Sequence, residues 1–69
     1  MDFDSISTGI MFIFDNYNED EELQEYVEGI DCAENDNDIR RNVKEIITIL
    51  DKRCDKNVDV IRQLFKSFI

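Results

Sequence analysis

The stretch DIRRNVKEIITILDKRC, residues 38–54, indicates the fold class of this 69-residue chain. Its apolar side chains recur at steps of three and four residues, the period of an α-helix with one buried face, and no Gly or Pro interrupts the pattern. The run therefore predicts an amphipathic helix over residues 38–54, with Asp36, Asn37 or Asp38 as its cap. The side chains predicted to face inward are Ile39, Val43, Ile46, Ile47, Leu50 and Cys54.

The segment before it, residues 19–28, has a helical period of its own. Asn18 followed by Glu21 three residues later resembles a capping box, and Gly29 is a suitable stop. The side chains predicted to face inward are Leu23, Tyr26, Val27 and Ile30.

A third helix is predicted over residues 5–16, with Asp4 or Ser5 as its cap. Gly9 weakens it by about 1 kcal/mol, and residues 9–14, which read GIMFIF, also fit a short buried strand. The apolar stripe runs through Phe3, Ile6, Ile10, Ile13 or Phe14, and Tyr17.

The last helix is predicted over residues 58–68, capped by Asn57. Its inward side chains are Ile61, Leu64, Phe65 and Phe68. The chain is thus expected to be one all-α domain over residues 1–69, built from four short helices. A core this small is thin, so a homodimer is expected, with Phe65, Phe68 and Ile69 at the subunit contact.

Composition excludes most catalytic chemistry. The chain has no His, so no Ser–His or Cys–His pair can form, and the zinc sites that depend on His are excluded. Cys32 and Cys54 lack CxxC spacing and are expected to be reduced, half-buried thiols. The N-terminus has no basic segment, and the apolar run at 9–14 is too short to span a membrane. We therefore expect a cytoplasmic protein that is not an enzyme, does not bind a membrane, and holds no metal and no cofactor.

Charge is divided sharply between the two halves of the chain. Residues 1–39 carry thirteen acids and no base, whereas the mildly basic half, residues 40–69, carries eight bases and four acids. If residues 19–30 are helical, Glu21, Glu25 and Glu28 form an outer row with one charge about every 5 Å. One DNA strand carries a charge about every 3.4 Å. The predicted partner-binding surface comprises Glu19, Asp20, Glu21, Glu22, Glu25, Glu28, Asp31, Glu34, Asp36 and Asp38; the alternative is that these acids only keep the protein soluble.

Three other motifs suggest no separate function. Residues 34–45 place oxygens at several positions of a calcium-binding loop, but Ile39 stands where the sharp turn needs Gly. The sequence Asp-Ser-Ile at residues 4–6 resembles the modified serine of acyl carrier proteins, yet no helix precedes it, so Ser5 is interpreted as a helix cap. The three bases Arg40, Arg41 and Lys44 are expected to pair with Glu34, Asp36 or Asp38, or with a neighbouring subunit.

In size, acidity, richness in Ile, Asn and Asp, and lack of catalytic residues, the chain resembles the small early proteins with which bacteriophages disable host machinery. Several of these are DNA mimics, and one from a Bacillus phage blocks the histone-like nucleoid protein HU. The resemblance implies a stoichiometric inhibitor that occupies the DNA-binding surface of a basic host protein and does not itself bind nucleic acid. A nucleoid histone-like protein is the first choice; RNA polymerase, a nuclease or a restriction factor are others. The alternative function is a helical interaction module that docks through its apolar C-terminal helix.

Overall fold

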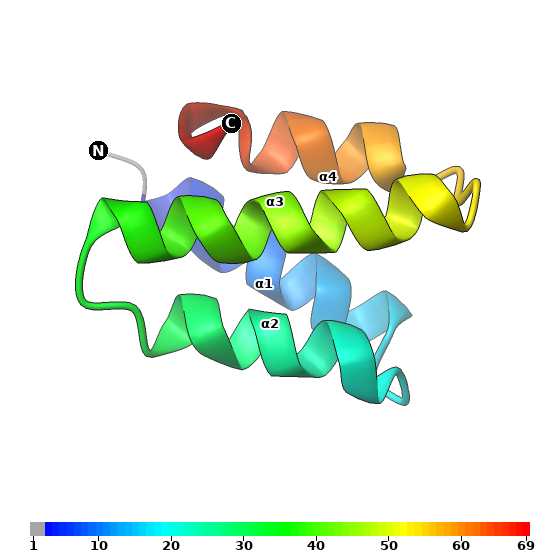
Figure 1. Ribbon diagram of the computed structural model, residues 1–69, viewed down its shortest axis with the longest axis horizontal. Helices are drawn as coiled ribbons and strands as arrows, with labels where there is room; N and C mark the ends of the chain where they lie inside the picture. Colours follow the sequence, from blue (N-terminus) through cyan, green and yellow to red (C-terminus); the bar gives the residue numbers. More distant parts are fainter. Residues whose placement is uncertain (1–2) are drawn as a thin grey trace.

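Residues 3–69 form four α-helices and one 3-10 turn (Figure 1). The computed structural model describes the backbone of residues 3–69 and the side chains from Ile6 onward. The elements are α1 (Phe3–Asn16), α2 (Glu21–Asp31), α3 (Asp36–Lys52), α4 (Val58–Leu64) and the 3-10 turn η1 (Lys66–Phe68). The all-α prediction is confirmed, and residues 9–14 are helix, not strand.

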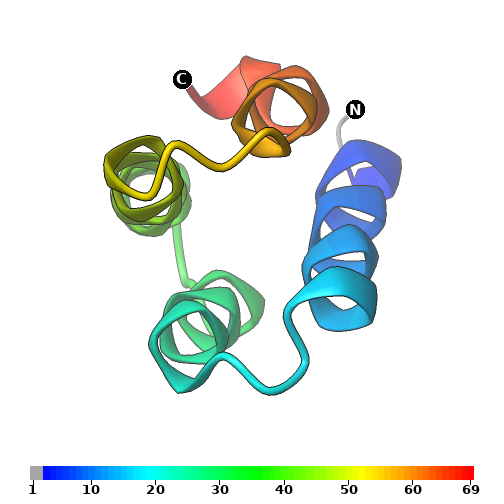
Figure 2. The same cartoon turned by 90° about the vertical axis from the view of Figure 1, so that its right-hand side faces the viewer.

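The helices lie at the four corners of a small bundle (Figure 2). Going round the bundle, α1 contacts α2, α2 contacts α3, α3 contacts α4, and α4 contacts α1. The α2–α3 contact is the most extensive. The core between them is entirely hydrophobic among the described residues, and its fully buried side chains are Ile13, Leu23, Val27, Val43, Ile46, Leu50, Ile61 and Phe65.

Helix α1 approaches the core closely at Gly9. A side chain at this position would overlap the ring of Phe65, which is fully buried. Gly9 therefore allows α1 to pack on Phe65 and offsets its poor helix propensity in this way. Of the two residues left open by the sequence, Ile13 faces the core and Phe14 is 45% exposed.

Both ends of α2 differ from the prediction. The N-cap is Asp20, whose Oδ1 accepts a hydrogen bond from the backbone N–H of Leu23 at 3.1 Å, so Asn18 and Glu19 precede the helix. Gly29 does not end the helix, which continues to Asp31 and buries Ile30. A Cβ at position 29 would collide with the side chain of Asn42, so Gly29 serves the α2–α3 contact.

Helix α3 begins earlier and ends earlier than predicted. The cap is Asn35, whose Oδ1 accepts from the N–H of Asp38 at 3.0 Å, and not one of the three residues after it. At the other end, Asp55 N–H donates to the carbonyl of Leu50 at 3.0 Å, which closes a Schellman-type turn with Cys54 at φ 54°. Cys54 thus lies outside the helix and its stripe.

Helix α4 is shorter than expected, because the chain tightens into η1 after Phe65. Phe65 is fully buried and Phe68 is 8% exposed, so both rings are already part of the core of their own chain. Neither is available as a subunit contact, which corrects that part of the prediction. Ile69, at 65% exposure, remains accessible. Both cysteines are exposed, not half-buried.

Candidate functional site

The outer side of α2 carries the predicted row of acids. Glu21, Glu25 and Glu28 are exposed, and the opposite side of the helix buries Leu23, Val27 and Ile30. From the first to the last glutamate the row rises about 10 Å along the helix axis. Because the backbone of α2 is held by packing on α1 and α3, the three carboxylates project from a rigid rod.

The remaining predicted acids extend this surface at both ends of α2. Glu19 lies in the turn before the helix, Asp31 is its last residue, and Glu34 and Asp36 follow; all four are exposed. Among the side chains that the structure describes, no base pairs with these four or with the row. We call the unpaired set the free acidic surface: Glu19, Glu21, Glu25, Glu28, Asp31, Glu34 and Asp36.

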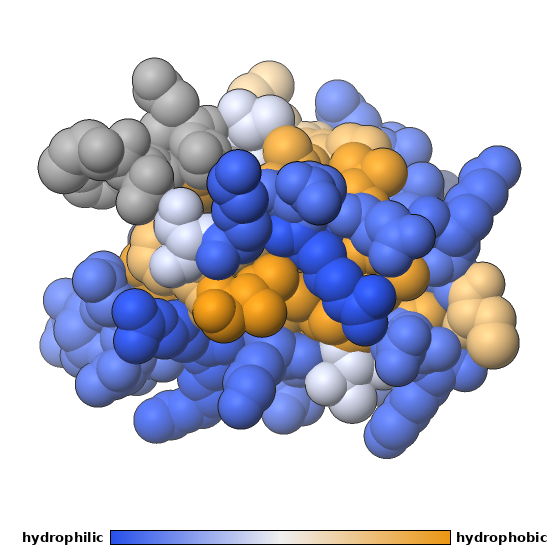
Figure 3. Space-filling model, turned by 90° about the horizontal axis from the view of Figure 1, so that it is seen from above, coloured by the Kyte–Doolittle hydropathy of each residue, from blue (hydrophilic) through white to orange (hydrophobic). Residues whose placement is uncertain are grey.

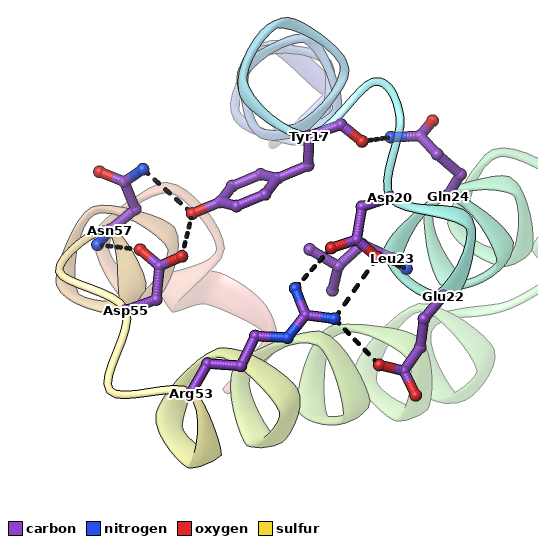
Figure 4. A network of polar contacts seen from close by, with 8 residues as sticks. All are labelled: Tyr17, Asp20, Glu22, Leu23, Gln24, Arg53, Asp55 and Asn57. Carbon is purple, nitrogen blue, oxygen red and sulfur yellow. Dashed lines mark hydrogen bonds and ion pairs between the residues drawn. The ribbon is translucent and has the colours of Figure 1, made fainter.

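Three of the ten predicted partner-binding acids instead face a base of the same chain. Arg53, just beyond α3, reaches back to the start of α2: its Nη1 lies 2.5 Å from Oδ2 of Asp20, and its Nη2 lies 3.1 Å from Oε1 of Glu22 (Figure 4). This guanidinium lowers the pKa of Asp20, mainly through the side-chain hydrogen bond. More weakly, Arg41 lies 4.0 Å from Asp38.

A second polar link joins the turn between α1 and α2 to the turn between α3 and α4. The hydroxyl of Tyr17 donates to Oδ2 of Asp55 at 2.8 Å and accepts from Nδ2 of Asn57 at 3.0 Å. The carbonyl of Tyr17 accepts from Nε2 of Gln24 at 2.8 Å, which ties the turn to α2. Burial, and then the hydrogen bond to Asp55, raise the pKa of Tyr17. The tyrosine hydroxyl is therefore neutral at physiological pH.

Asn57, predicted as the cap of α4, makes no side-chain capping bond. Its backbone N–H instead donates to Oδ1 of Asp55 at 2.8 Å, while its amide is directed to Tyr17. Sequence reasoning missed both the Arg53 and Tyr17 links. Their partners lie 31 to 40 residues apart, and no local pattern signals them.

The bases at the start of α3 do not neutralise the acidic surface. Within the described part of the chain Arg40 and Lys44 are exposed and form no ion pair, and Arg41 has only its 4.0 Å contact. Of the predicted partners Glu34, Asp36 and Asp38, the described residues show only Asp38 paired, with Arg41. The free acidic surface therefore keeps its charge next to these bases.

The free acidic surface presents carboxylates, which attract cationic groups and repel anions. A shallow open depression beside the α1–α2 turn is lined by Asn16, Tyr17, Asn18, Glu19 and Asp20. In residues 6–69, no three carboxylates or thiols gather as metal ligands would. Nor does any described helix have the length and apolar character needed to cross a bilayer.

Comparison with known proteins gives no relative from which to transfer a function: no protein family, curated protein or solved structure matches the chain. The free acidic surface, as the fold presents it, is therefore the feature that indicates a function.

Proposed function

We propose that this protein is a non-enzymatic DNA mimic that inhibits a basic nucleic-acid-binding protein by covering its DNA-binding surface. The observation that supports this most is the row Glu21, Glu25 and Glu28. These three carboxylates are exposed on one side of a packed helix, and no base of the described chain pairs with them.

The spacing of the charges in this row supports the comparison with a DNA strand. A helix places one such charge about every 5 Å, and a DNA strand places one about every 3.4 Å. A protein that binds phosphates through several Lys and Arg side chains can therefore engage several of these carboxylates at once. Complementary charge of this kind accelerates association and weakens as salt screens it.

Within this proposal, the internal ion pairs separate paired acids from unpaired ones. Arg53 partly neutralises Asp20 and Glu22, whereas the acids further along α2, from Glu25 to Asp31, have no such partner. Within this proposal, residues 25–36 contribute more to binding than residues 19–22. The net charge of −9 also disfavours direct binding of nucleic acid.

The alternative function, docking through the apolar face of the C-terminal helix, receives less support. Ile61, Phe65 and Phe68 are all turned into the core, so the predicted docking stripe is already occupied. Only Val60 and Ile69 remain as exposed large apolar side chains in that part of the chain.

A displacement assay tests the proposal. Fluorescent duplex DNA is bound to the histone-like nucleoid protein HU, and the acidic protein is titrated in. The wild type is expected to release the DNA, whereas the triple variant Glu21→Gln, Glu25→Gln and Glu28→Gln should release much less. Glutamine has nearly the same helix propensity and removes like-charge repulsion, so the variant keeps its fold.

The matched control changes the same number of charges in the other half of the chain: Glu45→Gln, Asp51→Asn and Asp59→Asn. Asp55 is left intact because it accepts hydrogen bonds from Tyr17 and Asn57. The control should displace DNA almost as well as the wild type. If both variants lost displacement activity equally, the effect would depend on net charge alone and not on the position of the acids. If the wild type did not displace DNA from HU, this target would be excluded.

A further inference from the structure

Arg53, at the end of α3, contacts the start of α2 (Figure 4). Its guanidinium makes two contacts with the carboxylate of Asp20, at 2.5 and 3.5 Å, and one with the carboxylate of Glu22, at 3.1 Å. Among the described residues, no other acid of α2 has a base within ion-pair distance. Arg53 is thus the reason that Glu22 does not belong to the free acidic surface.

The two acids that Arg53 contacts differ in how firmly they are held. The side chain of Asp20 is 20% exposed, and its Oδ1 also caps α2 by accepting from the N–H of Leu23 at 3.1 Å. The side chain of Glu22 is 60% exposed, and within the described part of the chain its one polar contact is with Arg53. Release of Glu22 therefore breaks a single exposed hydrogen bond, while the guanidinium stays on Asp20 and the cap is kept.

We propose that Arg53 competes with a cationic partner for Glu22 and so limits the strength of binding at the acidic surface. This inference rests on the proposed function, because it concerns the regulation of the same surface. A Lys or Arg of the partner that approaches Glu22 meets the positive charge of Arg53 and has to displace it from the carboxylate. Glu22 is three residues from Glu25 and is therefore its neighbour on the helix surface, so a displaced Arg53 adds one carboxylate beside the row.

Arg53 is the only described base that contacts α2, which makes its neighbour Lys52 a matched control. Lys52 is the last residue of α3, is exposed, and forms no ion pair with the described residues. Arg62 pairs instead with Asp51 and Asp59, on the side of the bundle where α4 lies. Figure 3 shows that side, where hydrophobic surface lies between the hydrophilic side chains.

A hexalysine peptide, titrated at low salt and followed by calorimetry, tests the competition. Arg53→Met is expected to tighten hexalysine binding about two- to fivefold, the range that an exposed ion pair supplies. Lys52→Met removes the same charge from the adjacent position and should tighten binding less, because Lys52 holds no carboxylate. Equal tightening by the two variants would show an effect of net charge alone and would overturn the proposal.

Glu22→Gln identifies the acid that is released, in a double-mutant cycle with Arg53→Met. With Arg53 present, Glu22→Gln should change hexalysine binding little. In the Arg53→Met background it should remove most of the gain. Glu25→Gln changes an acid that has no base beside it and should weaken binding by the same factor in both backgrounds. If Glu22→Gln also had the same effect in both backgrounds, Arg53 would not compete for this acid.

A second measurement uses the wild type alone and so does not depend on the stability of Arg53→Met. The side-chain carboxyl NMR shifts of Glu22 and Glu25 are followed as hexalysine is added. Glu25 should respond first, and Glu22 only at higher peptide concentration; parallel responses would contradict the competition. Because hexalysine takes the place of HU, these results test the role of Arg53, whereas the displacement assay tests the DNA-mimic proposal.

Discussion

Substituting the two glycines by alanine should affect stability in different ways, although both lie inside helices. In an exposed helix interior, Ala is more favourable than Gly by about 1 kcal/mol. At Gly9 a Cβ would lie 2.7 and 2.8 Å from the Cε atoms of Phe65, and closer still to its Cζ. That ring is fully buried and has no space into which to move. Overpacking of this kind costs about 1–3 kcal/mol, so Gly9→Ala should lose about 1 kcal/mol net.

Gly29→Ala is the matched comparison. The new methyl would meet the amide end of Asn42, a half-buried side chain that can rotate away. Moving it breaks the 2.8 Å hydrogen bond from Asn42 to the carbonyl of Asp38, a loss of about 0.5–1 kcal/mol. This loss and the propensity gain nearly cancel, so Gly29→Ala should be close to neutral.

Urea denaturation followed by circular dichroism measures both variants. For a domain of this size 1 kcal/mol corresponds to a shift in Tm of roughly 4–8 °C, which is easily resolved. If Gly9→Ala were as stable as Gly29→Ala, or more stable than the wild type, α1 would not pack on Phe65 as described.

Further predictions concern the contacts of Arg53 and Tyr17, which link the α1–α2 turn to the α3–α4 turn, and the backbone at Cys54. Arg53→Met should lose about 1 kcal/mol at low salt and less at high salt, whereas Arg41→Met, whose ion pair is longer and more exposed, should be neutral; equal losses would contradict the described contacts. Because the pKa of Asp20 is lowered on folding, its contribution to stability is present at neutral pH and is lost as acidification protonates it, and Arg53→Met should weaken this acid-limb dependence in a denaturation series. Because the pKa of Tyr17 is raised on folding, stability should fall as the pH rises above about 10, and Tyr17→Phe should remove that decrease. Cys54→Gly relieves a left-handed backbone and should raise the free energy of unfolding by about 0.5–1 kcal/mol; no gain would argue against that conformation.

The sequence predicted the helices well because their apolar periods coincide with the core. Leu23, Val27, Val43, Ile46 and Leu50 were all assigned inward and are fully buried. The outward row on α2 follows from the same period. These features depend on side-chain spacing within one helix, which a sequence displays directly.

Helix ends were less predictable because several neighbouring residues can cap. Asn18 and one of residues 36–38 were the predicted caps, whereas Asp20 and Asn35 accept the capping hydrogen bonds. Gly29 was predicted to end the helix. The helix continues past it, because Ile30 is buried in the core and the missing Cβ of Gly29 leaves room for the side chain of Asn42.

The split of the acidic surface could not be predicted either. Arg53 meets Asp20 and Glu22 only because α2 and α3 pack antiparallel, which brings the end of one beside the start of the other (Figure 1). The sequence assigned Phe65 and Phe68 to the inward face of the last helix and also to a subunit contact. The structure turns both inward, where they complete the small core.

The salt dependence of HU displacement tests the central claim most directly, that the free carboxylates of α2 form the partner-binding surface. The inhibition constant is measured across a salt series for the wild type, for the triple glutamine variant of Glu21, Glu25 and Glu28, and for the control variant of Glu45, Asp51 and Asp59. We predict a steep loss of inhibition with salt for the wild type and the control, and both weaker inhibition and a flatter dependence for the triple glutamine variant. Identical salt dependence in all three proteins would contradict the claim.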